Sequence, residues 1–400
     1  MIGNPMHRQV FLLASAQALF QTVTVLVVTV GALAGGQVAS RPGLATMPIA
    51  AMFLGTAAAT FPASMWMARV GRRTGFVAGA LLGVVGGLCA ALGIWLESLL
   101  LLSFGTFLVG GYQSFAQFYR FAASEVADET FRSRAISLVL GGGVVAAVAG
   151  PMLARLGGPL LQPEYVGSFL LLALVSLVAA GALLWLRVPT PQAIHSDADK
   201  GRSWGQIITQ PVYLVALFGA VTGYGIMILA MTATPLAMAH HHHDLPATAT
   251  VIQLHVLGMF LPSFFTGSLI ARFGVLPIML TGLVLLAGHV TMSLTGTGFG
   301  SFAGALVLLG IGWNFLYIGG TTLLTSTYTP AEKGRAQATN DMTIFACGLM
   351  SSVSAAALLE FLGWQMLNLL LLPWMGAAAL ALIWLGWKKR KVLPSTTIVR

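Results

Sequence analysis

The amino-acid sequence predicts an all-α membrane protein whose twelve transmembrane helices form two bundles of six. Of its 400 residues, 57% are hydrophobic and only 8% are charged. A soluble domain cannot bury so much apolar surface, whereas a chain that crosses a bilayer many times exposes it to lipid. The two cysteines, Cys89 and Cys347, both fall inside apolar segments and imply no disulfide framework.

Twelve apolar segments are each about 20 residues long or slightly longer, which is the length that an α-helix needs to cross the hydrocarbon core. The first half of the chain holds six of them, at 9–33, 44–68, 74–95, 98–122, 134–154 and 164–187. The second half holds the other six, at 211–236, 247–270, 275–294, 300–327, 340–360 and 364–387.

The loops between these spans differ in their content of basic residues. One set of alternate loops carries only Arg41 and Arg155, whereas the other set is strongly basic. By the positive-inside rule the basic set faces the cytoplasm, both termini are cytoplasmic, and the turn at 240–244 faces outward. The formal net charge of +9 therefore reflects basic loops beside a lipid bilayer, and no nucleic-acid partner is expected. The basic residues of the cytoplasmic set are Arg69, Arg72, Arg73, Arg132, Arg134, Lys200, Arg202, Arg272, Lys333, Arg335, Lys388, Lys389, Arg390 and Lys391.

A polar segment at 188–210 divides the chain near its middle, and its prolines and charges are typical of a linker. The predicted domains are a six-helix bundle at 1–187 and a second bundle, with a basic tail, at 211–400. The two halves also repeat, because Ser64–Gly71 resembles Gly267–Gly274 at an offset of 203 residues. Shorter matches at an offset of 201 relate Gly111–Gln113 to Gly312–Asn314 and Arg134–Ala135 to Arg335–Ala336.

The segment 227–259 contains a pattern that predicts a metal site. Met227 and Met231 form one pair at a spacing of four and His255 and Met259 form another, so each pair lies on one face of its helix. Both pairs are centred on residue 243, so antiparallel helices would place Met231 beside His255 and Met227 beside Met259, one turn deeper. Three thioethers and an imidazole suit Cu(I) better than Mg²⁺ or Ca²⁺. The alternative is that the methionines fill gaps between helices and that a carbonyl satisfies His255.

The turn between these two helices carries four consecutive histidines, His240, His241, His242 and His243. Neutral imidazoles at an outward-facing mouth could collect Cu²⁺, Zn²⁺ or Ni²⁺. Met238 lies on the same helix face as the predicted site and would connect the turn to it. The alternative is a solvated polar turn that binds no metal.

Polar and charged residues elsewhere in the spans indicate a central cavity or a gate. Gln17 and Gln21 share one face of the first span, although helix–helix hydrogen bonds explain them equally well. Arg120 is either a gating charge or a side chain that extends to the membrane interface. The candidates for these roles are Gln17, Gln21, Arg69, Arg120, Arg272, Asn314, Tyr317 and Asp341.

The loops after the second and eighth spans resemble the signature of the major facilitator superfamily, G-x-x-x-D-R-x-G-R-R. The first of them reads Ser64-x-x-x-Ala68-Arg69-x-Gly71-Arg72-Arg73. The resemblance implies a transporter of two six-helix bundles that works by alternating access.

The acidic residue of that signature is alanine in both halves, Ala68 and Ala271. The resemblance would otherwise imply that this carboxylate pairs across a cytoplasmic gate. Without it, the arginine that follows each alanine needs another partner or none, and Glu125 and Asp341 are the candidates.

Within the superfamily, the MxxxM and HxxxM motifs and the segment from Gly312 to Asp341 resemble the CcoA-type copper importers of bacterial inner membranes. The resemblance implies that copper is imported for cytochrome oxidase assembly, as cargo and not as a resident cofactor. We also expect a monomer that passes copper to a cytoplasmic copper chaperone or a copper-exporting ATPase.

Other functions are weighed against copper import. A sister branch of the same group is linked to riboflavin uptake, so an organic solute is the alternative cargo, with the methionines as packing. A non-transporting membrane sensor is a further alternative. No constellation of residues in the sequence indicates an enzyme.

Overall fold

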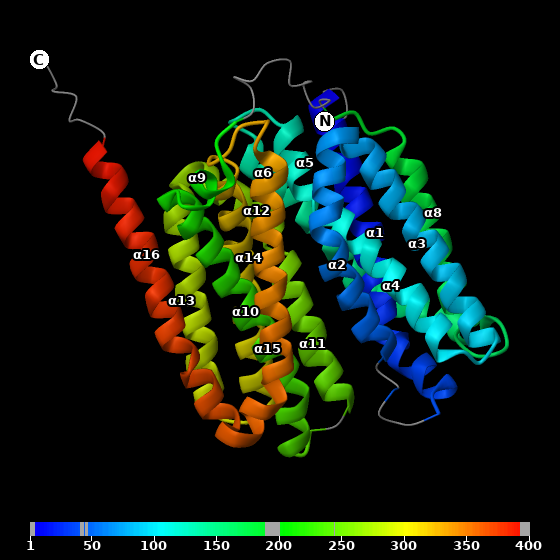
Figure 1. The fold of residues 1–400 in the computed structure, drawn as a ribbon. Helices are drawn as coiled ribbons and strands as arrows, with labels where there is room; N and C mark the ends of the chain where they lie inside the picture. Colours follow the sequence, from blue (N-terminus) through cyan, green and yellow to red (C-terminus); the bar gives the residue numbers. More distant parts are fainter. Residues whose placement is uncertain (1–4, 41–43, 45–46, 189–200, 244, 393–400) are drawn as a thin grey trace, which may run out of the picture. The chain divides into compact units, whose positions relative to one another are not determined.

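A computed structural model describes residues 5–40, 44, 47–188, 201–243 and 245–392, and the regular structure within these ranges is helical throughout (Figure 1). The chain forms two compact units. The first comprises Met1–Gly201 with Ser263–Gly267 and Tyr328–Phe345, and the second comprises Arg202–Pro262, Ser268–Thr327 and Ala346–Arg400. Two short segments of the second half of the sequence therefore belong to the first unit. The predicted linker lies largely at 189–200, outside the described residues.

The first unit is built mainly from the helices of the first half of the chain. A side-chain cap begins one of them, because the Ser98 hydroxyl accepts the Leu101 N–H at 3.3 Å. Its elements are α1 (Pro5–Val38), α2 (Met47–Val70), α3 (Arg72–Trp95), α4 (Leu99–Ala116), α5 (Tyr119–Val126), α6 (Arg132–Gly141), α7 (Gly143–Gly157), the 3-10 turn η2 (Gly158–Leu160) and α8 (Val166–Leu183).

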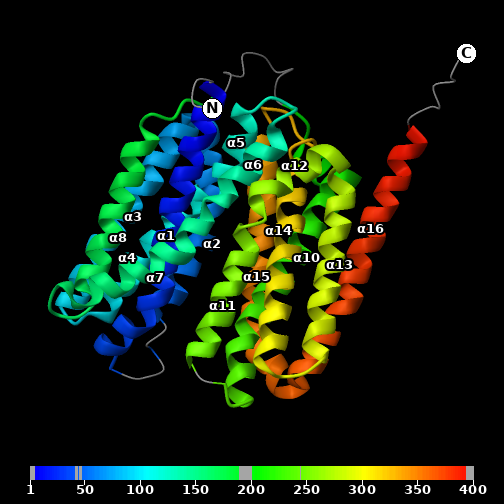
Figure 2. The same ribbon diagram turned by 180° about the vertical axis from the view of Figure 1, so that it is seen from behind.

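The second unit is organised around α14, which packs along α10, α11 and α13 (Figure 2). Gly363 interrupts the long helix α15 with φ 72° and ψ 170°, and the chain bends there before the last helix. The elements from residue 202 onward are α9 (Trp204–Ile208), α10 (Pro211–His240), α11 (Leu245–Phe260), α12 (Ser263–Phe273), α13 (Val275–Leu294), α14 (Phe299–Leu324), α15 (Lys333–Leu369) and α16 (Leu371–Val392).

Eleven helices among the described residues are long and apolar enough to cross a membrane, one fewer than the twelve predicted. The predicted span 340–360 is helical and lies within α15. Its first turns carry Asn340, Asp341 and Thr343, which lower its hydropathy. Three predicted spans are also broken, because 98–122 divides into α4 and α5, 134–154 into α6 and α7, and 247–270 into α11 and α12.

Glycine allows several of these helices to approach each other at backbone distance. A Cβ atom at Gly110 of α4 would lie 2.0 Å from the Met52 carbonyl oxygen of α2, and one at Gly55 would lie 2.1 Å from the Phe107 carbonyl oxygen. No other residue fits at either position without moving a helix. Small residues at helix contacts are typical of membrane proteins, since packing rather than the hydrophobic effect holds their helices together.

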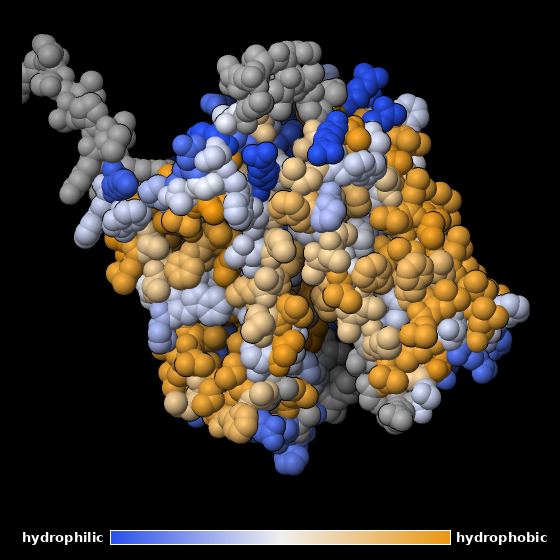
Figure 3. All heavy atoms as spheres, in the orientation of Figure 1, coloured by the Kyte–Doolittle hydropathy of each residue, from blue (hydrophilic) through white to orange (hydrophobic). Residues whose placement is uncertain are grey.

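Large apolar side chains remain exposed on helices of both units. Leu100 is 74% exposed, Val284 69% and Leu380 70%. On the face drawn in Figure 3, apolar side chains cover most of the surface and hydrophilic ones gather toward its ends. This distribution fits helices that face lipid along their length and water at their ends.

The sequence repeat has a counterpart in the backbone at Gly71 and Gly274. Both residues have φ 89° and ψ 160°, and each precedes the helix that follows its signature loop, α3 or α13. Only glycine adopts this region of φ/ψ space at little cost. The repeat therefore conserves a turn as well as a run of similar residues.

Replacing Gly71 or Gly274 by alanine should lower the free energy of unfolding by about 1–3 kcal/mol, because a Cβ atom strains the backbone at this φ and ψ. Unfolding by SDS titration in mixed micelles measures this change. Gly376→Ala in α16 is the control, since its Cβ would meet no other atom within 4 Å. Equal stability of the three variants would contradict the prediction.

Candidate functional site

An ion-pair network lies at the end of the first unit that is predicted to be cytoplasmic. Glu125, at the end of α5, accepts hydrogen bonds from Arg72 Nη2 at 2.7 Å and from Lys333 Nζ at 3.0 Å. The Arg72 side chain is only 4% exposed, and it also donates to Gln337 Oε1. The network therefore joins the start of α3 to the end of α5 and the start of α15.

Tyr328 extends this network in the connection between α14 and α15. Gln337 Nε2 donates a hydrogen bond to the Tyr328 hydroxyl at 2.7 Å. Burial raises the pKa of Tyr328, so its hydroxyl stays neutral at any physiological pH and serves as an acceptor.

A second ion pair, between Arg120 of α5 and Asp341 of α15, is fully buried. Arg120 Nη2 lies 2.5 Å from Asp341 Oδ1, and the two side chains are 1% and 0% exposed. Asn340 Nδ2 donates to the same oxygen at 2.8 Å, and the Arg120 guanidinium stacks over Phe121 at 4.7 Å. Arg120 therefore points inward and does not extend to the interface.

These pairs differ from the partners considered for Arg69 and Arg272, while a gating role for Arg120 or Asp341 stays a prediction. Asp341 pairs with Arg120 and Glu125 pairs with Arg72 and Lys333. Arg69 and Arg272 are exposed and form no ion pair with a described residue. Loss of the signature carboxylate thus leaves these two arginines at the surface, and the buried charges use a different set of partners.

Two serine–glycine contacts involve Ser64 and Gly267, which each come four residues before an alanine that replaces a signature carboxylate. The Ser64 hydroxyl of α2 donates to the Gly334 carbonyl of α15 at 3.0 Å, and the Ser133 hydroxyl of α6 donates to the Gly267 carbonyl of α12 at 2.9 Å. Gly267 is the repeat counterpart of Ser64, at the offset of 203, and Gly334 is that of Ser133, at the offset of 201. The two contacts are therefore related by the repeat, with donor and acceptor exchanged.

Ala68 lies directly beside the first of these contacts. A Cβ atom at Gly334 would lie only 3.1 Å from the Ala68 Cβ. Because Ala68 is small, α2 and α15 approach each other closely at this point. The uncharged hydrogen bond from the Ser64 hydroxyl to the Gly334 carbonyl joins the two helices there.

The four predicted metal ligands all lie in the second unit, but their helices are not packed side by side. Met227 and Met231 lie in α10, and His255 and Met259 lie in α11. These two helices touch at few positions, whereas α14 packs along both of them (Figure 2). Met231 is half-buried and the other three side chains are buried. The side-by-side hairpin is not observed, and binding of one ion by all four residues stays a prediction.

His255 is held by α14. Its Nδ1 atom lies 2.8 Å from the Leu306 carbonyl oxygen, which only accepts, so Nδ1 carries a proton. Its Nε2 atom is buried and makes no hydrogen bond to a described residue. Histidines that bind metals have this arrangement, and so does a core histidine that one carbonyl satisfies.

The histidine turn is mostly at the surface. His240, His241 and His242 are exposed, while His243 Nε2 contacts the Thr297 carbonyl oxygen at 2.7 Å. Met238 is fully buried. Asp244 lies outside the described residues. Among the described residues, no three His, Cys, Asp or Glu side chains gather in a way that could hold a metal ion.

Aromatic side chains of the second unit form a continuous cluster, of which only Tyr317 is among the predicted site residues. Trp313 and Tyr317 of α14 stack with their centroids 4.9 Å apart and their planes at 18°. Tyr224 of α10 lies 6.1 Å from Tyr317, and Phe260 of α11 meets Trp313 edge-on at 5.9 Å. The spacing of four between Trp313 and Tyr317 was the signal in the sequence, since it places both rings on one helix face.

Asn314 and the two glutamines complete the predicted polar set. Asn314 is fully buried, and its Nδ2 atom donates to the Met259 carbonyl at 2.6 Å, so it ties α14 to α11. Gln17 is buried and Gln21 half-buried in α1. These residues belong to different units, and the structure does not bring them into one site.

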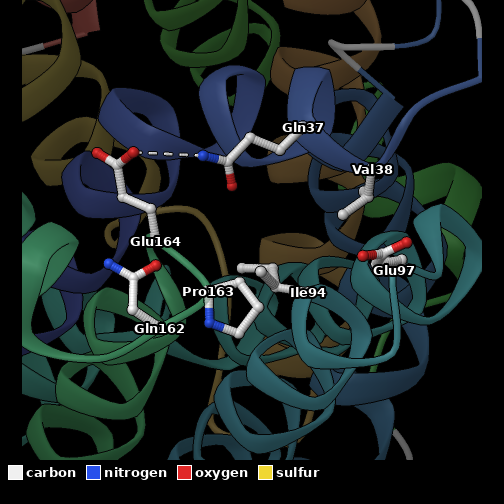
Figure 4. Close-up of a pocket in the computed structure, with 7 residues that line it drawn as sticks. All are labelled: Gln37, Val38, Ile94, Glu97, Gln162, Pro163 and Glu164. Atoms are coloured by element: carbon white, nitrogen blue, oxygen red, sulfur yellow. Dashed lines mark hydrogen bonds between the residues drawn. The ribbon is translucent and has the colours of Figure 1, made fainter.

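A pocket of about 330 Å³ opens in the first unit at the end opposite its ion pairs (Figure 4). Its acidic side chains, Glu97 and Glu164, are exposed, and Gln37 Nε2 donates to Glu164 Oε2 at 3.4 Å. Exposed carboxylates without a buried partner are solvated and do not define a binding site. The lining residues are Gln37, Val38, Ile94, Glu97, Gln162, Pro163 and Glu164.

Comparison with known proteins defines the class. Residues 10–253 and 215–398 each match the model of the Major Facilitator Superfamily. The chain belongs to the major facilitator superfamily, and it is a multi-pass membrane transporter. The fold agrees, since the Escherichia coli fucose:proton symporter FucP superposes with a TM-score of 0.78 at 16% identity, over 95% of this chain and 99% of that one.

Two relatives are similar along most of their length. The riboflavin transporter RfnT of Brucella anthropi is 42% identical over 372 residues, which cover 92% of this chain and 93% of that protein. The uncharacterised transporter YdeG of Bacillus subtilis is 30% identical over 375 residues, which cover 86% of each. The relative whose cargo is named is a riboflavin transporter and not a copper importer, and neither relative gives support to copper as cargo or to a copper chaperone or a copper-exporting ATPase as partner.

Replacing Asp341 by asparagine should lower the free energy of unfolding by about 3–5 kcal/mol, because it leaves the Arg120 charge buried without its counterion. SDS titration measures the change. Glu360→Gln, an exposed carboxylate on the same helix, should have little effect. The double variant Arg120→Met, Asp341→Leu should recover most of the loss, since a buried pair can be replaced by apolar side chains. A double variant as unstable as Asp341→Asn would contradict this account.

Replacing Gly334 by valine should cost about 1–3 kcal/mol, because the new side chain overpacks the contact with Ala68. Adding Ala68→Gly removes the obstructing methyl and should recover part of that loss. Gly300→Val is the control, since no atom lies within 4 Å of its Cβ position. Additive effects of the Gly334 and Ala68 changes would show that the two positions do not touch.

Proposed function

We propose that this transporter imports riboflavin, or a flavin with the same tricyclic ring system, across the bacterial inner membrane. One observation carries the proposal: the 42% identity to a riboflavin transporter over 92% of this chain. This similarity extends over both bundles and is not confined to one motif.

The aromatic cluster of the second unit supports this cargo. The isoalloxazine ring of a flavin is planar and aromatic, and aromatic side chains bind such rings by stacking. Trp313 and Tyr317 already present nearly parallel planes. Tyr224 is half-buried, so it is the ring of this cluster that a solute meets first.

The charge distribution of the second unit also suits a neutral cargo. The ion pairs among the described residues lie in the first unit, and Asn314, next to Trp313 in α14, is bonded to a main-chain carbonyl. A neutral flavin with hydroxyl and imide groups needs hydrogen-bonding partners and no counterion.

Copper is the second candidate, and His255 is the observation in its favour. Donation from Nδ1 to Leu306 leaves a buried Nε2 lone pair, and the thioethers of Met227 and Met259 are buried in the same unit. Thioether and imidazole ligands suit Cu(I). Packing explains the same methionines without a metal.

Replacing Tyr224 by leucine should raise the KM for riboflavin about tenfold, because loss of one stacking ring costs about 1–3 kcal/mol of binding. Tyr224→Phe keeps the ring and should transport with a KM close to that of the wild type. Uptake of radiolabelled riboflavin by cells that lack other flavin transporters measures both.

The same cells separate the two cargoes. If riboflavin is the cargo, Met227→Leu and Met259→Leu transport it normally, since leucine keeps the packing and removes only the sulfur. Absence of riboflavin uptake by the wild type, together with copper uptake that both leucine variants lose, would overturn the proposal in favour of copper.

A further inference from the structure

The backbone on both sides of Tyr224 packs closely against neighbouring helices of the second unit. A Cβ atom at Gly223 would lie 2.9 Å from the Leu316 Cβ of α14, and one at Gly225 would lie 2.5 Å from Trp374 Cη2 of α16. A Cβ atom essentially never lies within 3.0 Å of such a neighbour, so a side chain at either position would displace what it meets. The two glycines thus let α10 pack closely where Tyr224 leaves it, and the direction of the ring depends on what surrounds the side chain.

Gly348 of α15 lies against the edge of the Tyr224 ring. A Cβ atom at Gly348 would lie 2.6 Å from Tyr224 Cε1 and 3.0 Å from Tyr224 Cδ1, and the next nearest atom is Ile228 Cγ1 at 3.7 Å. Gly348 is buried, whereas Tyr224 is half-buried. The tyrosine ring therefore occupies the space that a side chain at position 348 would fill.

Gly348 differs from the glycines that let two helices approach each other. At Gly55 and Gly110 the nearest atoms to an added Cβ belong to the main chain of another helix, whereas at Gly348 the three nearest atoms all belong to side chains. A methyl group at position 348 therefore displaces a ring and need not separate two helices. Because carbon atoms pack at about 3.5–4.0 Å, the Tyr224 ring would have to move by about 1 Å.

The orientation of Tyr224 matters because this ring is the accessible end of the aromatic cluster. Trp313 and Tyr317 are only 4% and 3% exposed, whereas Tyr224 is half-buried. The Tyr224 ring lies 6.1 Å from that of Tyr317, with the two planes at 33°. Stacking depends on the separation and offset of the rings, so a change in the tilt of Tyr224 alters the surface on which a planar cargo can stack.

We propose that Gly348 is a positioning residue for the cargo: because it lacks a side chain, the Tyr224 ring lies against α15 in the orientation that stacks on a flavin. Gly348 acts through Tyr224 and does not itself bind the cargo. The proposal rests on the proposed function, and it deepens that function by naming the residue that orients the stacking ring.

The kinetics of riboflavin uptake into proteoliposomes test this role. Gly348→Ala should raise the KM about tenfold, as loss of the stacking ring does, and should change kcat by less than about twofold, because only cargo binding is weakened. Gly304→Ala in α14 is the matched control, since its Cβ would lie at the same distance, 2.6 Å, from a side chain outside the aromatic cluster, that of Met292. This control should keep the KM of the wild type. A KM for Gly348→Ala equal to that of the wild type would overturn the proposal.

A second comparison separates positioning from general packing, and it decides the question even where Gly348→Ala alone does not fold. Tyr224→Ala removes the ring that the new methyl group would displace, so adding Gly348→Ala to it should leave the KM within about twofold. A further rise of about tenfold would show that Gly348 does not act through Tyr224, and it would overturn the proposal. If wild-type liposomes take up no riboflavin, the proposed function fails and this proposal fails with it. Wild-type uptake together with an unchanged KM in Gly348→Ala overturns this proposal alone.

Discussion

Charge inside a membrane protein is tolerated only when a partner compensates it, and the buried pair of Arg120 and Asp341 shows how strongly this constraint acts. The two residues are 221 positions apart in the sequence, yet their side chains meet at 2.5 Å with almost no exposure. Either charge alone would cost several kcal/mol in that environment. Together with Arg72, Glu125 and Lys333, they tie the start of α15 to α3 and α5. These pairs thus hold the start of α15 within the first unit.

In the part of the second unit that the structure describes, neutral polar groups take the place of ion pairs. His255, His289 and Asn314 each donate to a main-chain carbonyl of a neighbouring helix, at 2.8, 2.9 and 2.6 Å. Such bonds fix the side chains without introducing charge. The charges of the first unit, in contrast, hold helices together through ion pairs.

The choice between copper and a flavin shows why a short motif is a weak guide to cargo. Methionine is both a soft metal ligand and a side chain that fills gaps between helices, so its spacing does not separate the two roles. In the structure α14 packs along both α10 and α11, and these two helices touch each other at few positions. This weakens the geometric argument that the four predicted ligands bind one metal ion. The similarity to a riboflavin transporter extends over 92% of the chain, so it rests on many more residues than the four of the copper motif.

The sequence by itself determined the class of fold, because apolar segments of spanning length and an internal repeat depend only on local composition and spacing. The repeat also pointed to Gly71 and Gly274, whose backbones agree in φ and ψ. Only the tertiary structure decided which charges pair, which rings stack and which buried atoms lack partners. The sequence does not show which arginine pairs with Asp341, and its partner Arg120 lies 221 positions away. Contacts of this kind arise from how helices pack, and packing depends on the shape of every side chain in the interface rather than on the pattern within one helix.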